Sequence, residues 1–399
     1  MGRAHRRTGF ATARKAAGHT RESLAAALGV DRTTVSTWES GEAIRRSREE
    51  WLRMRSPEGV RGRELSELAA WLYPEEVRAP GGHVLAGPGW LWDEPVPLDE
   101  VRLRWVEAAQ PGALEVEHLV PLTDLGVPYR GYSRAVRDVV RPRLMENRPS
   151  YRLTEVGPGA SFGFGMTAFF SVFDVKQAVA HEFKAAWAAG GREAPGWDEL
   201  PVRRSIGMPF DPAALLMSPG ISTLTIRRGR RGEHTFVLHE RDSAKVADGG
   251  GLAHVLPAGE FQPATADPRA DLSLWNTIMR EFSEEFLGDP EHDGVDPVDY
   301  TRPPFTRFEA AKRRGRFRVS HYGLVMEPLE LGAGQLTVAV VDGDTFDVLF
   351  ADRVAVNDEG AVGRDVPFTD EAVRRLEPRL SGSALTLLRL ALRDRRSLV

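Results

Sequence analysis

Apolar residues near the N-terminus recur at helical spacing in a short run, RESLAAALG. Leu24, Ala25 and Leu28 form one apolar stripe along this run, as expected for an amphipathic helix. Thr20 precedes the run and can cap the start of the helix with its hydroxyl. Gly29 follows the run and can supply the positive φ that ends a helix. The pattern therefore predicts a short helix with a defined start and end.

A second short helix is predicted over residues 32–40, RTTVSTWES. Val35 and Trp38 form its inner face, Asp31 caps its start, and Gly41 ends it. Two short helices joined by about three residues that include a glycine are the signature of a helix-turn-helix. The alternative is a helical hairpin that packs on the rest of the chain and has no role in DNA binding.

The run that begins at Phe10 resembles the DNA-binding domains of the phage-repressor (Cro-like, XRE) family. The L-A-x-x-L-G-V corner, the polar start of the next helix and the W-E-x-G ending carry the resemblance. It implies that the helix over residues 32–40 lies in the major groove of DNA. The residues that would face base edges are Arg32, Thr33 and Thr37. The residues that would lie near phosphates are Thr20, Arg21, Thr34 and Ser36.

The resemblance also implies a structural pair, Arg14 and Glu39, which would tie the first helix to the third. The sequence departs from the family after Gly41. The family places its next helix soon after that glycine, whereas here the candidate ELSELAAWL starts at Glu64. The arginine-rich segment between them, residues 43–63, is either an extra phosphate-contacting helix or a linker.

The whole chain divides into four predicted units. They are a helical, basic helix-turn-helix domain (1–79), a Pro/Gly-rich linker (80–97), a middle region of unassigned role (98–219) and a domain of alternating strands and helices (220–399). The middle region includes an expected helix at residues 174–189. In the last unit, ISTLTIRR and HTFVLHE flank the basic turn 227–231 and are expected to form a hairpin. The predicted fold class is multidomain, with an all-α N-terminal domain followed by an α/β (α+β) domain.

One helix of the last unit, predicted over residues 272–287, has a crowded acidic face. Its apolar stripe consists of Leu274, Trp275, Ile278, Met279, Phe282 and Phe286. Glu281, Glu284 and Glu285 lie within about 100° of one another on the other side. Carboxylates crowded in this way favour a divalent cation when they are partly buried, and Mg²⁺ or Mn²⁺ suits such an oxygen site. The alternative is an ordinary surface helix.

The same helix carries REFSEEF, which resembles the R-E-u-x-E-E core of the Nudix box, where u is an aliphatic or aromatic residue. VLPAGEFQP before it resembles the strand and glycine turn that open that box. The resemblance implies a Nudix-like fold and a metal-dependent hydrolase of nucleoside diphosphates linked to another moiety. Glu281, Glu284 and Glu285 would then be the metal ligands. Arg280 would orient a glutamate, and Gly259 would shape the turn.

This box departs from the family's pattern in its spacing. The family places a glutamate where Leu272 stands here, with Asp271 as its neighbour. The gap from Gly259 to Arg280 is longer than usual, and the closing glycine, Gly288, comes late. These departures favour a domain that has the fold but has lost competent hydrolysis.

Charge is unevenly distributed along the chain. The net charge is −4, but residues 1–63 contain 14 basic and 7 acidic residues. A basic segment on an acidic remainder favours a polyanion partner at the N-terminal end. Basic clusters at residues 227–231 and 313–318 could grip the phosphates of a ligand, although such runs are more often solvated turns. The absence of cysteine excludes disulfides and thiolate chemistry.

These patterns predict a sequence-specific transcriptional regulator that binds double-stranded DNA as a homodimer. Its Nudix-like domain would sense a nucleotide-like or phosphorylated small-molecule ligand, or would mediate dimerisation. The first alternative is an Mg-dependent nucleoside-diphosphate-type (Nudix) pyrophosphohydrolase fused to a DNA-binding head. The second is a helix-turn-helix that serves only protein contacts. We expect a cytoplasmic, nucleoid-associated protein without a membrane partner, because no apolar run reaches the length of a membrane span.

Overall fold

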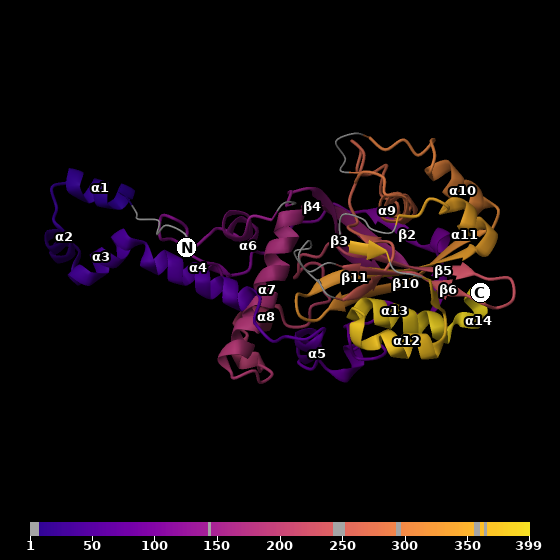
Figure 1. The fold of residues 1–399 in the computed structure, drawn as a ribbon, viewed down its shortest axis with the longest axis horizontal. Coiled ribbons are helices and arrows are strands. Elements are labelled where there is room, and N and C mark those ends of the chain that lie inside the picture. The colour runs from indigo at the N-terminus through magenta and orange to yellow at the C-terminus, as the bar shows by residue number, and fades with distance from the viewer. Residues whose placement is uncertain (1–7, 143–144, 242–251, 293–296, 355–359, 363–364) are drawn as a thin grey trace.

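The computed structural model describes residues 8–142, 145–241, 252–292, 297–354, 360–362 and 365–399. The molecule is elongated, because a small helical head stands away from a larger α/β body and a single long helix, α4, runs between them (Figure 1). We refer to residues 8–41 as the head and to the chain from residue 64 onward as the body.

Three short helices form the head. They are α1 (Thr8–Ala16), α2 (Arg21–Leu28) and α3 (Arg32–Ser40). Thr20 and Asp31 start α2 and α3, because each side chain accepts a hydrogen bond from a backbone N–H of the first turn, at 3.0 and 2.7 Å. Gly29 and Gly41 end these helices with left-handed φ values of 67° and 68°, which glycine adopts without steric cost. The two predicted helices and the turn between them are confirmed.

The helix α4 (Glu42–Arg55) follows α3 directly and connects the head to the body. Its far end packs on α7 (Phe169–Ala189), where the ring centre of Trp51 lies 5.1 Å from that of Tyr132 and 6.2 Å from that of His181. Trp51 is 3% exposed, so this end of α4 belongs to the core of the body. The first part of the arginine-rich segment after the head is therefore a helix anchored to the body.

The body is built on a mixed sheet. Its strands, in spatial order, are β1 (Leu91–Pro97), β10 (Phe317–Glu327), β11 (Gly332–Asp342), β5 (Gly220–Arg228), β6 (Thr235–Phe236) and β13 (Val366–Pro367), with β9 (Ala258–Gly259) also paired to β5. β5 and β11 run parallel, and the other neighbours run antiparallel. Ile226 of β5 pairs with Phe236 of β6, so the hairpin expected around residues 227–231 is confirmed.

Helices cover both faces of this sheet (Figure 1). One face carries α9 (Leu274–Leu287), α10 (Phe305–Arg313) and α11 (Gly343–Leu349), and the other carries α12 (Asp370–Leu376), α13 (Gly382–Arg393) and α14 (Arg395–Leu398). The alternation of strand residues explains both layers, since Ala339 and Val341 of β11 pack with α9 while Val338 and Val340 pack with α13. The predicted fold class, a helical N-terminal region followed by a mixed α/β region, is confirmed.

The remaining elements surround this sheet. Two three-stranded sheets have the spatial orders β2 (Arg102–Trp105), β4 (Ser161–Ala168), β3 (Pro149–Gly157) and β12 (Gly360–Val362), β7 (Leu238–Arg241), β8 (Ala253–Val255). The other helices are α5 (Glu64–Ala70), α6 (Tyr132–Ala135) and α8 (Pro201–Ile206). The helix expected at residues 174–189 is confirmed as the larger part of α7.

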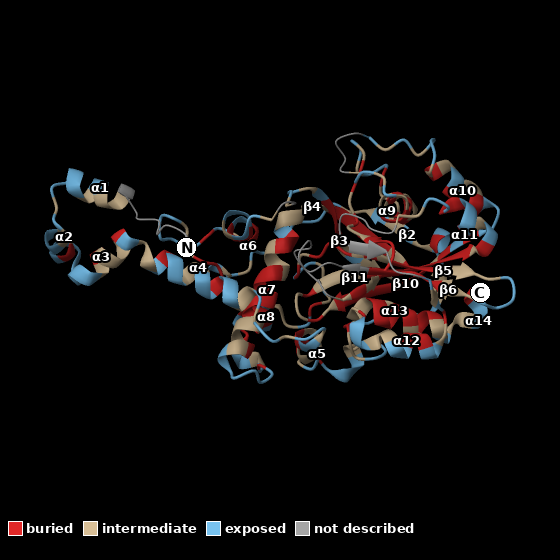
Figure 2. Cartoon of the chain, viewed as in Figure 1, coloured by how far each residue is buried: buried red, intermediate tan, exposed pale blue. Residues whose placement is uncertain are grey.

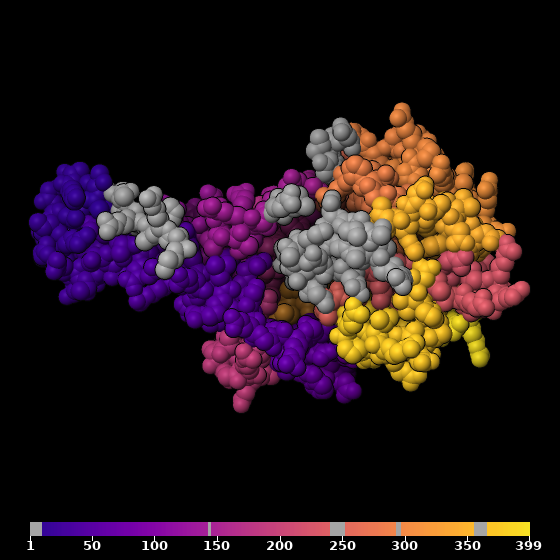
Figure 3. Space-filling model, viewed as in Figure 1, coloured from indigo at the N-terminus to yellow at the C-terminus, as the bar shows by residue number. Residues whose placement is uncertain are grey.

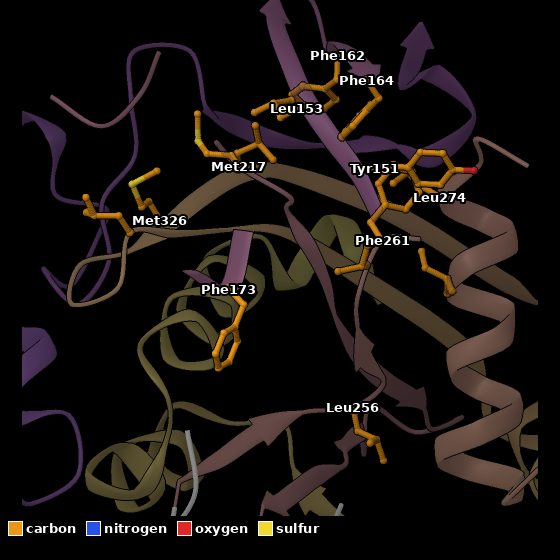
Figure 4. Close-up of a cluster of buried hydrophobic side chains, with 14 of the residues drawn as sticks. Tyr151, Leu153, Phe162, Phe164, Phe173, Met217, Leu256, Phe261, Leu274 and Met326 are labelled. Atoms are coloured by element: carbon orange, nitrogen blue, oxygen red, sulfur yellow. The ribbon is translucent and has the colours of Figure 1, made fainter. Parts of the chain in front are cut away.

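The middle region shares one hydrophobic core with the C-terminal region. Tyr151 and Leu153 of β3 and Phe164 of β4 lie in the same cluster as Phe261 and Met326 from later in the chain (Figure 4). The ring centres of Tyr151 and Phe261 are 4.6 Å apart. Residues of the middle region and of the C-terminal region therefore contribute to one core, and a domain boundary between them stays a prediction.

Residues 80–97 differ from the linker that their composition suggested. Val84 and Leu85 are buried, and Leu85 forms a β-bridge with Met326. The second half of the segment is β1, which pairs with β10. β1 lies at the edge of the sheet, where strands tolerate the prolines that made this stretch resemble a linker. The division of the chain into domains stays a prediction.

Candidate nucleic-acid interface

The helix α3 presents a polar face at one end of the molecule (Figure 2). Arg32 and Thr33 are exposed, whereas Thr34, Ser36 and Thr37 are partly exposed. Val35, on the inner side of the helix, is fully buried. Among the described residues, the hydrogen bonds and ion pairs of α3 stay within the head and the first residue of α4. The face that the sequence assigned to DNA is thus open to a large ligand.

Arg32, the residue expected to read a guanine, is paired with Glu22 of α2. Arg32 Nε lies 2.5 Å from Glu22 Oε1, and the two side chains are 64% and 60% exposed. An exposed ion pair of this kind contributes at most about 1 kcal/mol. The guanidinium can therefore exchange this partner for a base edge at small cost.

Glu39 ties the three helices of the head together. Its carboxylate accepts hydrogen bonds from Arg14 Nε at 2.6 Å and from Arg21 Nε at 2.5 Å, and Arg14 also donates to the carbonyl of His19 at 2.5 Å. The hydrogen bond from Arg14, followed by that from Arg21, lowers the pKa of Glu39. The predicted Arg14–Glu39 pair is confirmed. Arg21, predicted to lie near a phosphate, keeps 42% of its side chain exposed while its Nε holds Glu39.

The threonine hydroxyls of the head have partners within the head. Thr33 Oγ1 donates to Asp31 Oδ1 at 2.5 Å, and Thr37 Oγ1 donates to the carbonyl of Thr33 at 2.9 Å. The Thr20 hydroxyl oxygen caps α2. These bonds orient the side chains before any ligand binds, and contact of Thr20, Thr33 and Thr37 with DNA stays a prediction.

The second sequence candidate, α9, is arranged differently, because its polar residues turn into the body. Arg280 Nη1 donates to Asp271 Oδ2 at 3.2 Å and also to the Tyr300 hydroxyl, while Nη2 donates to the carbonyl of Gln262 at 2.7 Å. Arg280 and Asp271 are 3% and 2% exposed. The expectation that Arg280 orients a glutamate is corrected here. Its acidic partner is Asp271, which adjoins the position where the Nudix box has an acid.

Two of the three glutamates of α9 bond to different parts of the chain. Glu285 Oε2 accepts a hydrogen bond from Ala258 N at 2.9 Å, and Glu285 Oε1 lies 3.9 Å from His239 Nδ1. Glu284 Oε1 instead accepts a hydrogen bond from His292 N at 2.7 Å. Burial raises the pKa of Glu284 to about 7, against the opposing effect of that hydrogen bond. The two carboxylates therefore have separate environments.

Glu281 lies against β9. A Cβ added to Gly259 would lie 2.1 Å from Glu281 Oε1, so glycine at this position leaves the space that the carboxylate occupies. Within the described ranges, no group of three or more acidic or histidine side chains is arranged to hold a metal ion. Ligation of Mg²⁺ or Mn²⁺ by Glu281, Glu284 and Glu285 stays a prediction.

The basic turn at residues 227–231 has acidic partners nearby. Arg227 pairs with Asp347, Arg228 with Asp342 and Arg230 with Asp344. All three aspartates lie in or next to α11. A phosphate would have to compete with these carboxylates, which argues against this turn as a ligand site.

The middle region has one basic surface to which no role is assigned from the sequence. Arg130, Arg134, Arg137 and Arg141 are all exposed and follow one another at intervals of four, three and four residues. They lie on and around α6, next to α4. The helical repeat of arginines was the signal in the sequence that could have revealed this surface.

Comparison with known proteins agrees with the geometry of the head. Residues 10–46 match the family model described as Helix-turn-helix. The match spans α2 and α3 and ends in α4. The N-terminal segment is therefore a helix-turn-helix of the XRE type, which is a class of DNA-binding domain.

Comparisons of the whole chain add little. It is similar to a Nudix hydrolase from Alicyclobacillus acidocaldarius, with 14% identity, 43% of this chain and 90% of that chain covered, and a TM-score of 0.26. It is also similar to a mutT/nudix family protein from Listeria innocua, with 14% identity, coverage of 45% and 94%, and a TM-score of 0.27. No curated protein matches the chain.

No helix within the described residues has both the length and the apolar composition required to cross a membrane.

Proposed function

We propose that this chain is a sequence-specific, DNA-binding transcriptional regulator in which α3 enters the major groove. The observation that carries the proposal is the exposed polar face of α3 within a matched helix-turn-helix. Arg32 would donate two hydrogen bonds to a guanine, and Thr33 and Thr37 would contact neighbouring bases. The residues that would contact phosphates are Thr20, Arg21, Thr34 and Ser36.

The test of this proposal is the substitution Arg32→Ala in the full chain. A preferred duplex is first selected from a random library with the unmodified protein, and both proteins are then titrated against it. We expect the variant to bind the selected duplex about 10- to 100-fold more weakly and to lose preference at one base position. Arg374→Ala, an exposed arginine of α12, is the matched control. Unchanged affinity and preference in the Arg32 variant would mean that α3 does not read DNA.

The body would act as a sensor or as a dimerisation unit. A cavity of about 580 Å³ lies between β1, the segment that follows it and the turn at residues 157–160, and its lining includes Trp92, Glu100 and Arg102. An aromatic surface and a guanidinium suit a nucleotide-like or phosphorylated ligand. Asp99 also lines the cavity, but it pairs with Lys312 at 2.6 Å. Ligand binding here would alter the spacing of two heads in a homodimer, and hence their affinity for DNA.

Calorimetry with a panel of nucleotides, repeated with Trp92→Ala, tests the sensing role. We expect one nucleotide of the panel to bind the protein and to change its affinity for DNA. We expect Trp92→Ala to weaken the binding of that nucleotide. Light scattering tests the homodimer, and a mass of one chain both with and without DNA would contradict it. Absence of binding by every nucleotide would leave the body as a dimerisation unit only.

The alternative, a pyrophosphohydrolase attached to a DNA-binding head, requires the three glutamates to share a metal ion. Within the described residues they do not form such a group. Release of phosphate from nucleoside-diphosphate derivatives that depends on Mg²⁺ and is abolished by Glu284→Gln would establish this alternative. We expect no such activity.

A further inference from the structure

A stripe of four arginines lies outside the helix-turn-helix. Arg130, Arg134, Arg137 and Arg141, here called the arginine stripe, are exposed. Arg134 lies in α6 and Arg137 in the π-helical turn at residues 136–140, whereas Arg130 and Arg141 flank these elements. The opposite side of this segment is anchored in the body, because its apolar residues are buried. These residues are Tyr132, Ala135 and Val136. The segment therefore holds the arginines on a rigid support and directs them outward.

The arginine stripe lacks the acidic partners that arginines have elsewhere in this protein. None of the ion pairs found in the described part of the chain includes any of its four members. Arg141 Nε donates to the backbone carbonyl of Asp138 at 3.2 Å, and the Arg137 guanidinium lies 6.0 Å from the centre of the Phe170 ring. The basic turn at residues 227–231, by contrast, is neutralised by aspartates. The positive charge of the stripe is thus available to an external anion.

The position of the stripe relates it to the head. The loop that leads into α6 is bonded to α4, because Arg48 donates to the carbonyl of Leu122 at 3.1 Å and Ser47 Oγ accepts from Leu122 N at 3.1 Å. Tyr132 of α6 packs on Trp51 at the far end of α4. In Figures 1 and 3 this segment lies beside α4, between the head and the body. The stripe therefore lies on the part of the body from which α4 leads to the head.

We propose that the arginine stripe binds the phosphates of double-stranded DNA that flanks the site contacted by α3. This inference rests on the proposed function. Guanidinium groups bind phosphates with two parallel hydrogen bonds. Several separate guanidinium groups on one anchored segment suit the repeating phosphates of a DNA backbone. The stripe would add affinity and salt dependence without adding base specificity.

The test uses the full chain with Arg130→Ala, Arg134→Ala and Arg137→Ala combined. Arg141 is left unchanged because its φ of 59° is left-handed. Affinity is measured for random-sequence duplexes of two lengths, one covering only a helix-turn-helix site and one twice as long, over a range of salt concentrations. We expect the slope of log K against log salt to fall by about 2 to 3 on the longer duplex. On the shorter duplex we expect little change.

Two matched variants complete the experiment. Arg313→Ala, Arg314→Ala and Arg374→Ala combined remove the same charge from exposed positions of the body, and we expect them to leave the slope unchanged. Arg130→Lys, Arg134→Lys and Arg137→Lys combined keep the charge and should retain most of the slope. An equal loss in the body variant would show a general charge effect and overturn the proposal. An unchanged slope in the stripe variant would also overturn the proposal. The same holds if the stripe variant loses binding only to single-stranded RNA or to an acidic peptide.

Failure of this inference is distinguishable from failure of the proposed function. If Arg32→Ala removes sequence preference while the stripe variant binds long duplexes with the normal slope, the head reads DNA and the stripe does not contact it. If neither variant changes binding, the proposed function fails first.

Discussion

The helices α3 and α9 look alike in sequence but differ in what surrounds their polar side chains. Each has a polar N-cap and a glycine in the left-handed conformation at its end. Arg32, Thr33 and Thr37 of α3 are at least partly exposed, and within the described residues their side chains have partners in the head. The polar residues of α9 bond inward, Arg280 to Asp271 and Glu285 to the backbone of β9. An amphipathic motif thus indicates a ligand site only where the rest of the fold leaves its polar face uncovered.

The difference follows from the number of neighbours that each helix has. In the head, Val35 of α3 and Ala25 of α2 are buried apolar residues. Three short helices enclose little volume, so most polar side chains of the head stay at the surface. The helix α9 lies between the main sheet, α10 and the middle region, so even its charged residues are enclosed. Four predictions test this comparison.

The largest effect is expected for Glu39→Ala, which removes the carboxylate that holds the head together. Arg14 and Arg21 would both lose their acidic partner, and we expect the head to lose about 3 to 4 kcal/mol of stability. Hydrogen exchange should show faster exchange in α1–α3 and unchanged protection in the body. Glu22→Ala removes an exposed carboxylate of the same head and is the control. Equal exchange rates in the Glu39 variant and the unmodified head would contradict the role of Glu39.

The next effect concerns the buried charge of Glu284. The pKa of this carboxyl is raised from 4.5 to about 7 in the folded protein. The contribution of Glu284 to the stability of the fold is therefore fully present below pH 4.5 and is lost as the pH rises through 7. Glu284→Gln removes this loss and keeps an acceptor for His292 N. We expect the variant to be more stable than the unmodified protein by about 2 to 3 kcal/mol at pH 8, and by much less at pH 4.5.

Denaturant unfolding of both proteins at a series of pH values measures this difference. The comparison between the two proteins cancels other titrating groups, among them His181, whose pKa is lowered to about 4 mainly by burial. A constant difference across the pH range would contradict the raised pKa of Glu284.

A smaller effect is expected where α9 meets β9. Gly259→Ala places a methyl group in the space of the Glu281 carboxylate, which must rotate away at a cost of about 1 kcal/mol. Adding Glu281→Ala should recover part of that loss, because the methyl then has room. A double-mutant cycle of unfolding free energies measures the coupling. Strictly additive losses would mean that the carboxylate does not occupy this space.

The smallest effect is expected for Glu22→Gln in the head. This variant frees Arg32 from an exposed ion pair, so the affinity for the selected duplex should rise by about three-fold. Glu50→Gln removes the same charge from an exposed position of α4 and serves as the control. A similar rise in both variants would indicate general electrostatics and no specific release of Arg32.

Local features of this protein were predictable and distant pairings were not. Thr20, Gly29, Asp31 and Gly41 have the roles that their types suggest, because a cap or a turn depends on a few neighbouring backbone groups. Residues 80–97 were predicted as a linker because prolines and glycines weaken a strand pattern. An edge strand accepts them, and only the partner β10 makes the segment a strand.

The candidate sites divide in the same way. The exposed face of α3 follows from a motif that carries its own turn and caps. The acidic partner of Arg280 could not be assigned from spacing alone, because Leu272 occupies the position where the family has an acid and Asp271 lies one residue before it. The arginine stripe was visible as a repeat of arginines, but its exposure and its place beside α4 depend on contacts of Tyr132 and Leu122 with α4.

The amino-acid sequence by itself determined the helices of the head, the turn between them and the alternation of strands and helices in the body. These features arise from interactions among residues a few positions apart. Only the tertiary structure decided which charged side chains meet solvent, as Arg32 and Arg134 do, and which meet another part of the chain, as Glu285 and Arg228 do. The physical reason is that access to water depends on segments far away in the sequence, and access to water decides which charges can receive a ligand.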